Sequence, residues 1–175
     1  MSTPPPSPPA IGSLGAGDGL DGVAIPEPGT RANAERRWYV GLGFRPGAET
    51  AALRAALRAA LDAVAANGPG GDPPDRVVVA VPWFRDRHPA LPAALSAFEL
   101  EVEMVTEQAL AAAQPRCSTR SARAVATVGI ASVAEGCALA AAGATGKLWM
   151  PRRTADGVTW ALAHVPGGVA PVGRG

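Results

Sequence analysis

The chain has 175 residues, of which 47% are hydrophobic and 18% are charged. This length suits one domain of ordinary size, and this composition excludes a wholly disordered chain. Sixteen basic and fifteen acidic residues leave a formal charge of +1, so the chain lacks the strong positive charge typical of non-specific nucleic-acid binding. Two cysteines cannot build a disulfide framework, and neither belongs to a CxxC pair.

The two ends of the chain differ in composition from its middle. Residues 1–34 are rich in proline and glycine with few large apolar side chains, and residues 166–175 have the same character. Such segments bury too little apolar surface to offset the entropy lost on ordering, so both are predicted to be disordered tails. The sequence has no secretory signal at its start and no apolar run long enough to span a bilayer. These features predict a soluble cytoplasmic protein with one domain at residues 35–165.

Strands and helices alternate along this domain. Apolar, β-branched or strictly alternating runs predict strands, and apolar residues at helical spacing predict helices. The predicted strands are 38–43, 76–81, 100–105, 147–150 and 158–163. The predicted helices are 49–67, 88–98, 107–113, 118–129 and 132–143.

The order of these elements predicts the fold class. Alternating strands and helices favour a mainly parallel sheet that is covered on both faces. The last two predicted strands are joined through Asp156-Gly157, a strong signal for a β-hairpin. We therefore expect a three-layer α/β/α fold with a mainly parallel sheet of about five strands and a C-terminal β-hairpin.

Three glycines follow closely in and after the first predicted strand. Gly41, Gly43 and Gly47 lie where a dinucleotide-binding fingerprint would lie, but the third glycine comes one residue too late. No acidic residue closes the second strand in the expected place either. The glycines instead let backbone N–H groups approach a ligand at the carboxyl end of the sheet, so we expect them to line a binding site.

Hydroxyl and arginine side chains gather at residues 116–123, where a helix is predicted to begin. A helix N-terminus has unpaired N–H groups and a partial positive charge, and both attract anions. Two interpretations have equal weight here: a carboxylate or phosphate site, and ordinary capping beside a solvated helix face. The candidates for ligand binding in this segment are Ser118, Thr119, Arg120 and Ser121.

Ser132 and Glu135 have the spacing of a capping box, in which each side chain bonds to the backbone N–H of the other residue. Capping is the favoured interpretation of Glu135. The alternative is a catalytic proton acceptor that faces a ligand pocket, with Ser132 among the residues that bind the ligand.

The cysteines and histidines are scattered along the chain. No two of Cys117, Cys137, His88 and His164 have the spacing of metal ligands, so the sequence predicts no metal site. A nucleophilic Cys117 paired with His164 stays open as an alternative to a small, inert thiol.

Several segments, taken together and in order, carry a family resemblance. They are residues 39–47, 117–121, 128–135, 150–153 and 158–163. The set resembles the CobE proteins and the C-terminal domain of CbiG, both of cobalamin biosynthesis, and the resemblance covers about Tyr39 to Ala163. Two departures stand out: a lysine usual after the second strand is replaced by Arg85 or Arg87, and a lysine usual in the closing hairpin is replaced by Arg152.

The resemblance implies a ligand from the corrin pathway. Corrinoid and precorrin intermediates are apolar macrocycles fringed with acetate and propionate carboxylates. Arginines grip carboxylates bidentately, so Arg45, Arg120, Arg123 and Arg152 are expected to bind this fringe. Aromatic surface for the ring would come from Trp83, Phe84 and Trp149, although packing in the core is the expected use of at least one of them.

Three functional hypotheses follow. The favoured one is an accessory protein that binds or carries a corrinoid or precorrin intermediate, since no nucleophile, base and orienting group can be assembled from local motifs. The alternative is an enzyme that acts on such an intermediate, with Glu135 or a water held by Ser or Thr as its base. It would be an isomerase or, as the resemblance to CbiG implies, a hydrolase of the cobalt-precorrin-5A type, which opens a lactone and releases acetaldehyde. The third is an interaction module that reaches other cobalamin-pathway enzymes through its proline-rich tail. The sequence predicts no cofactor, no nucleic-acid partner and no membrane partner.

Overall fold

The structure is a computed structural model that describes residues 37–67, 74, 76–120 and 130–166. Its strands are β1 (Arg37–Phe44), β2 (Arg76–Pro82), β3 (Glu101–Val105), β4 (Lys147–Ala155) and β5 (Val158–His164). Its helices are α1 (Thr50–Asn67), α2 (Ala90–Leu95), α3 (Glu107–Ala113) and α5 (Val133–Ala141), with short 3₁₀ helices η1 (Trp83–Arg85) and η2 (Gln114–Arg116). The expected tails, apart from Pro166, lie outside the described residues.

The five strands form one sheet in the order β3-β2-β1-β5-β4. Strands β1, β2 and β3 are parallel, whereas β5 is antiparallel to both of its neighbours. The prediction of a mainly parallel sheet is therefore wrong, and the sheet is mixed. The reason is that the hairpin returns β5 to the middle of the sheet, where it pairs with β1 from Phe44 to Trp38.

The predicted strand number and the C-terminal hairpin are confirmed. At the hairpin turn Asp156 and Gly157 have φ angles of 49° and 76°, the left-handed pair that a type I′ turn requires. The predicted helix over 49–67 is confirmed as α1, and Thr106 caps α3 by accepting a hydrogen bond from the backbone N–H of Ala109.

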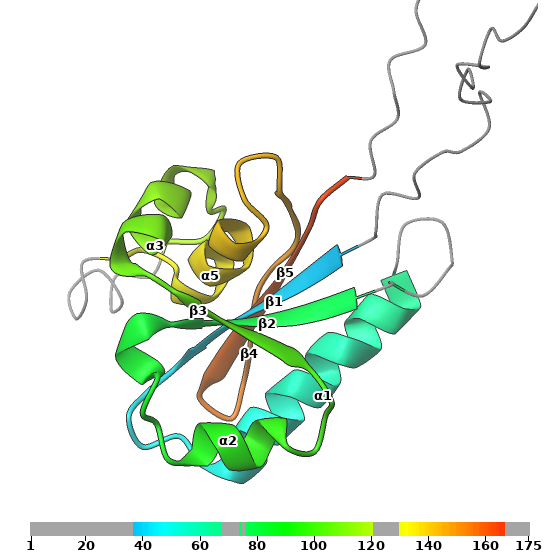
Figure 1. Ribbon diagram of the computed structural model, residues 1–175, viewed down its shortest axis with the longest axis vertical. Coiled ribbons are helices and arrows are strands. Elements are labelled where there is room, and N and C mark those ends of the chain that lie inside the picture. The colour runs from blue at the N-terminus through cyan, green and yellow to red at the C-terminus, as the bar shows by residue number, and fades with distance from the viewer. Residues whose placement is uncertain (1–36, 68–73, 75, 121–129, 167–175) are drawn as a thin grey trace, which may run out of the picture. The chain divides into compact units, whose positions relative to one another are not determined.

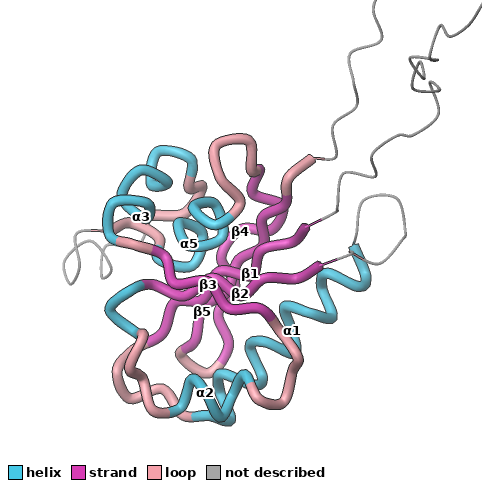
Figure 2. The backbone as a smooth tube through the Cα atoms, in the orientation of Figure 1, coloured by secondary structure: helices cyan, strands magenta, loops and turns pink. Residues whose placement is uncertain are grey.

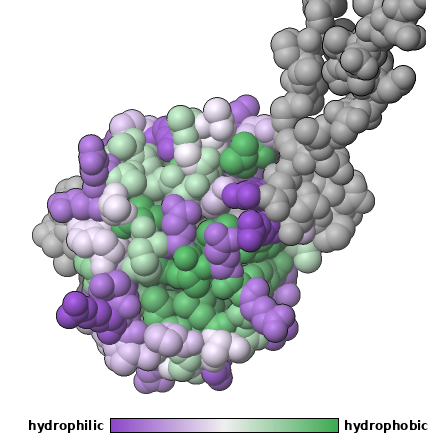
Figure 3. All heavy atoms as spheres, in the orientation of Figure 1, coloured by the Kyte–Doolittle hydropathy of each residue, from purple (hydrophilic) through white to green (hydrophobic). Residues whose placement is uncertain are grey.

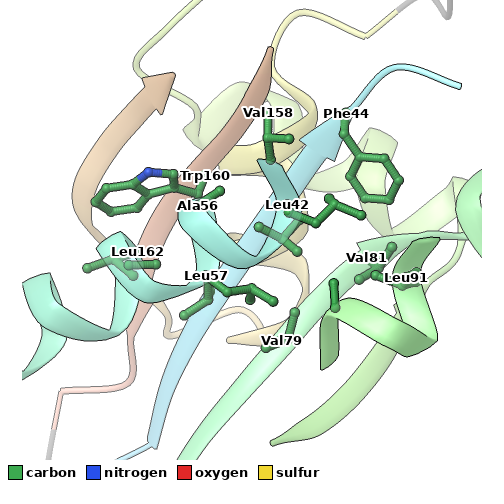
Figure 4. Packing of buried hydrophobic residues seen from close by; sticks show 14 of the residues in the cluster. Leu42, Phe44, Ala56, Leu57, Val79, Val81, Leu91, Val158, Trp160 and Leu162 are labelled. Carbon is green, nitrogen blue, oxygen red and sulfur yellow. The ribbon is translucent and has the colours of Figure 1, made fainter. Parts of the chain in front are cut away.

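Helices cover both faces of the sheet (Figure 1), with α1 and α2 on one face and α3 and α5 on the other (Figure 2). Alternate residues of β2 point to opposite faces. Val79 and Val81 pack with Leu57 of α1 (Figure 4), whereas Val78 and Ala80 join the clusters beneath α3 and α5. This double burial explains the continuous β-branched run of the second strand.

Two predicted helices differ from the structure. Helix α2 is shorter than the predicted 88–98, because the chain after β2 first forms η1 and then a turn in which His88 bonds to the carbonyl of Pro46. Residues 118–120 have no regular structure, so the helix predicted over 118–129 does not begin there, and the rest of that range lies outside the described residues.

Strand β3 forms one edge of the sheet, on the side of the molecule where Figure 3 shows an apolar area. Val102 is 38% exposed and Met104 is 39% exposed, so the strand is wetter than its alternating sequence predicts. As an edge strand, β3 has a neighbouring strand on one side only, that of β2. Within the described ranges, no helix combines the length and apolar character needed to cross a bilayer.

Helix α5 packs directly on the backbone of β1 because β1 has glycines at the contact. A Cβ atom on Gly41 would lie 2.0 Å from the carbonyl oxygen of Ala134 and 2.5 Å from the amide nitrogen of Ala138. A Cβ on Gly43 would lie 2.6 Å from Oγ1 of Thr159 and 3.2 Å from Cβ of Val133. Both glycines therefore permit the close approach of a helix.

We expect Gly41→Ala to destabilise the domain by about 2 kcal/mol or more, because the added methyl group must displace the backbone of α5. Gly47→Ala is the matched control, since its Cβ would meet nothing within 4 Å. Denaturant unfolding of both variants measures the difference. Equal stabilities of the two variants would contradict this account of helix packing.

Candidate functional site

The carboxyl ends of β1, β2 and β3 share one edge of the sheet, where ligands of open α/β sheets usually bind. Helix α5 begins at the same edge, because Val133 and Ala134 lie beside Gly43 near the end of β1. The loop after β1 and the β4–β5 turn also meet here, since the guanidinium of Arg45 lies against Gly157.

Glu135 is the most heavily bonded side chain of this region. It is fully buried, and its carboxylate accepts hydrogen bonds from three backbone N–H groups: Ser118 at 2.7 Å, Thr119 at 2.9 Å and Arg152 at 2.9 Å. The hydroxyls of Ser118 and Thr119 donate to the same carboxylate. One carboxylate thus joins α5, the loop after η2, and β4.

These bonds decide the charge of Glu135. Burial by itself raises the pKa of a carboxyl group, because it disfavours the charged form. The hydrogen bonds from Arg152, Thr119 and Ser118 act in the opposite direction and prevail, so the pKa of Glu135 is lowered from its ordinary value. The side chain is therefore ionised at neutral pH.

The predicted capping box is wrong. The side chain of Ser132 makes no capping hydrogen bond, and its Oγ is buried with no partner among the described residues. Glu135 bonds to two other segments instead of to the first turn of its own helix. Three backbone N–H groups from outside the helix offer the carboxylate more than the single N–H of a capping box.

The anion site suggested at residues 116–123 does have an anion, and that anion is Glu135. The backbone N–H groups of Ser118 and Thr119 both point at its carboxylate. The side chain of Arg120 is exposed, and Ser121 lies outside the described residues.

Arg116 and Gln114 have roles that the sequence did not reveal. Arg116 donates to three carbonyl oxygens at distances of 2.9–3.2 Å: that of Leu139 in the last turn of α5, and those of Gly143 and Gly146 in the turn that follows the helix. The side-chain amide of Gln114 makes two hydrogen bonds with the backbone of Ser132. Its Oε1 accepts from the N–H of Ser132 at 3.1 Å, and its Nε2 donates to the carbonyl oxygen of Ser132 at 3.3 Å. Gln114 belongs to no recognisable motif. Arg116 begins the segment 116–123 in which arginines and hydroxyls gather, but nothing in that pattern predicts that it binds carbonyls of the chain.

The remaining candidates are spread over the same edge. Arg45 and Gly47 line a hollow of about 190 Å³ together with Ala48, Glu49, Ala52 and Asp156. Arg152 is half-buried, and its backbone N–H makes the contact with Glu135. The register of β4 against β5 shifts between Met150 and Arg153, which frees this N–H from the ladder.

Cys117 and His164 do not form the pair that the sequence left open. Cys117 donates weakly to the carbonyl of Ala113, and burial, together with the charge of Glu135, raises the pKa of the thiol to about 11. His164 stacks on Trp38 with 5.4 Å between ring centroids, and the edge of Trp149 lies against it. Among the residues that the structure describes, no three His, Cys, Asp or Glu side chains gather as metal ligands.

Comparison with known protein families shows which family this chain belongs to. The family described as "Cobalamin synthesis G C-terminus" matches residues 38–163, which is nearly the whole span from β1 to β5. The chain belongs to this family. It is therefore a cobalamin-biosynthesis protein, and the resemblance found in the sequence is confirmed.

Two solved structures are similar to this chain. The first is CobE, "a protein from the cobalamin (vitamin B12) biosynthetic pathway", with a TM-score of 0.61, 28% identity, and coverage of 78% of this chain and 95% of that one. The second is the cobalamin biosynthesis protein chiG from Agrobacterium tumefaciens, with a TM-score of 0.51, 29% identity, and coverage of 72% and 96%. A comparison with curated protein sequences finds no match.

We expect Glu135→Gln to destabilise the domain by roughly 2–4 kcal/mol at neutral pH, since it removes the charge that three N–H groups face. The effect should depend on pH. A lowered folded-state pKa stabilises the native protein above the ordinary pKa of about 4.3, and this contribution disappears as the pH falls through that value towards the lowered one.

Denaturant unfolding at several pH values checks this prediction. The difference between wild type and Glu135→Gln should be constant above about pH 5 and should shrink below it. Glu99→Gln is the control, because Glu99 is exposed. A difference that does not change with pH would contradict the assignment of an ionised, hydrogen-bonded Glu135.

Proposed function

We propose that this chain is a cytoplasmic protein that binds a corrinoid or precorrin intermediate and holds it or passes it on without converting it. Membership of the cobalamin-biosynthesis family supports a ligand from this pathway. The likeness to CobE, which aligns over 95% of that chain, supports a role for the domain on its own.

The environment of Glu135 is the observation that favours a binding function over a catalytic one. A general base works best when its pKa lies near the operating pH and when it can reach the proton that it removes. Glu135 has a lowered pKa, is fully buried, and is already surrounded by five hydrogen-bond donors of the protein. Its carboxylate therefore supports the architecture of the site rather than proton transfer.

The ligand would be recognised mainly by its carboxylates. The hollow beside Arg45 has about 190 Å³, less than the roughly 300 Å³ at which sites begin to enclose a drug-sized molecule. A corrin macrocycle would lie on the surface of this edge, with its acetate and propionate groups meeting arginines around the hollow, because Glu49 and Asp156 in the lining of the hollow disfavour a carboxylate inside it. Arginine side chains suit this contact, because each binds a carboxylate through paired N–H groups.

The alternative is a hydrolase that opens a lactone of a cobalt-precorrin. The buried Oγ of Ser132, which has no hydrogen-bond partner among the described residues, is the observation in its favour. An unsatisfied hydroxyl at the start of a helix can orient a water molecule, and this water would then be the nucleophile.

Titration of the purified chain with cobyrinic acid, a corrin with free carboxylates, tests the proposal through visible absorbance. We expect saturable binding, and Arg120→Ala or Arg152→Ala should weaken it by roughly 1.5–3 kcal/mol for each lost charged hydrogen bond. Arg58→Ala is the control, because Arg58 lies on α1, on the opposite face of the sheet from α5, against the ring of Phe98. Absence of binding to the wild-type chain would overturn the proposal.

Mass analysis separates binding from catalysis. A precorrin lactone incubated with the chain should be recovered with its mass unchanged. A gain of one water with the wild-type chain, with or without the loss of acetaldehyde, that is absent with Ser132→Ala would replace the carrier with the hydrolase.

A further inference from the structure

Arg85 is held in a fixed position immediately after β2. Its Nε donates to the carbonyl oxygen of Phe44 at 2.9 Å, and its Nη1 makes a longer contact of 3.5 Å with the carbonyl of Phe84. The guanidinium carbon lies 5.0 Å from the centre of the Phe84 ring and 5.9 Å from the centre of the Phe44 ring. Two carbonyls and two aromatic faces therefore orient this cation.

The charge of Arg85 has no counter-ion among the described residues. The ion pairs found there join Arg76 to Glu101 and Arg87 to Asp86. Arg85 is nevertheless half-buried, and partial burial lowers the pKa of its guanidinium. Removing a cation from water without an acidic partner is unfavourable, so this arrangement suits a residue that meets its partner only when a ligand binds.

The position of Arg85 matches the edge where a ligand is expected. Phe44 belongs to the core on the α1 face, and Phe84 packs with the cluster that includes Ile130 on the α5 face. Arg85 therefore lies above the carboxyl ends of β1 and β2, between the two helical layers. Pro82 ends β2 and η1 begins at the next residue, which places Arg85 just beyond the sheet.

His88 lies beside Arg85 and has one buried ring nitrogen that bonds and one that does not among the described residues. Its ring packs edge-on against Phe44 at 5.1 Å, and its Nε2 bonds to the carbonyl of Pro46 at 2.7 Å. Its Nδ1 is buried and finds no hydrogen-bond partner in the part of the chain that the structure describes. The ring thus fixes both Phe44 and the turn that leads to the hollow lined by Arg45.

We propose that Arg85 determines specificity for the ligand by binding one of its side-chain carboxylates through the N–H groups that the described residues leave free. An arginine has five N–H donors, and the Phe44 and Phe84 carbonyls engage only part of this set. Arg87, two residues later, is the natural contrast, because its side chain is 95% exposed and faces Asp86. This inference rests on the proposed function.

Binding of cobyrinic acid and of its methyl ester to matched variants tests the inference. Arg85→Gln should weaken binding of the acid roughly tenfold to a hundredfold and leave binding of the ester unchanged, because the ester has no carboxylate. Arg85→Lys should lose most of the same affinity, since an ammonium cannot reproduce the planar fork between two rings. Arg87→Gln should stay within about twofold of wild type.

The remaining outcomes distinguish a failure of the role assigned to Arg85 from a failure of the proposed corrin binding. Wild-type affinity of Arg85→Gln for the acid would overturn the role of Arg85 and leave the proposed function intact. If the wild-type chain binds no corrin, the proposed function fails. Arg85 can then be tested alone by adding propionate and following its side-chain Nε–H signal by NMR. This signal is assigned as the one that Arg85→Lys removes from the spectrum. A shift of this signal with propionate but not with propionamide would sustain the carboxylate site, and an unmoved signal would overturn it.

Discussion

The buried carboxylate of Glu135 joins three segments that lie far apart in the chain: α5, the loop at Ser118 and Thr119, and the shifted register of β4 at Arg152. A charge in the interior destabilises a protein by several kcal/mol unless donors surround it. Here the donors are mostly backbone N–H groups, which remain whatever side chain the loop carries. The path of the chain at this edge therefore depends on the carboxylate of Glu135, which holds in place the segments at Ser118, Thr119 and Arg152.

That arrangement requires α5 to lie unusually close to the sheet. The glycine at position 41 lets the backbone of α5 touch β1, and the small residues Ala134 and Ala138 face it. Arg116 then satisfies carbonyls in the last turn of α5 and in the turn that follows it, while Gln114 holds the backbone just before its start. The close packing on β1 restricts the distance of α5 from the sheet, and the hydrogen bonds of Arg116 and Gln114 restrict its position along the helix axis. Together they hold Glu135 beside its hydrogen-bond donors.

Local patterns in the sequence were enough to predict the strands, helices and turns, but not which strands pair or which groups bind the buried side chains. The β-branched run of β2 and the Asp156-Gly157 turn were predictable, because both depend on neighbours within a few residues. The pairing of β5 with β1 was not, since it joins residues more than a hundred positions apart. The capping-box spacing of Ser132 and Glu135 was misleading for the same reason: N–H groups 16–17 residues away compete for the carboxylate, and no local pattern records them.

Two charged groups at this edge, Glu135 and Arg85, differ in their surroundings, and the difference bears on function. The carboxylate of Glu135 stays charged, but hydrogen bonds from the protein's own N–H and hydroxyl groups surround it, so it has little capacity left for a ligand or a proton. The cation, Arg85, is oriented by carbonyls and rings but meets no carboxylate among the described residues. A ligand that completes such an edge must bring negative charge. A macrocycle fringed with carboxylates brings negative charge in several places at once. One oriented arginine, Arg85, can then fix how the ring lies, while exposed arginines such as Arg120 bind the remaining carboxylates.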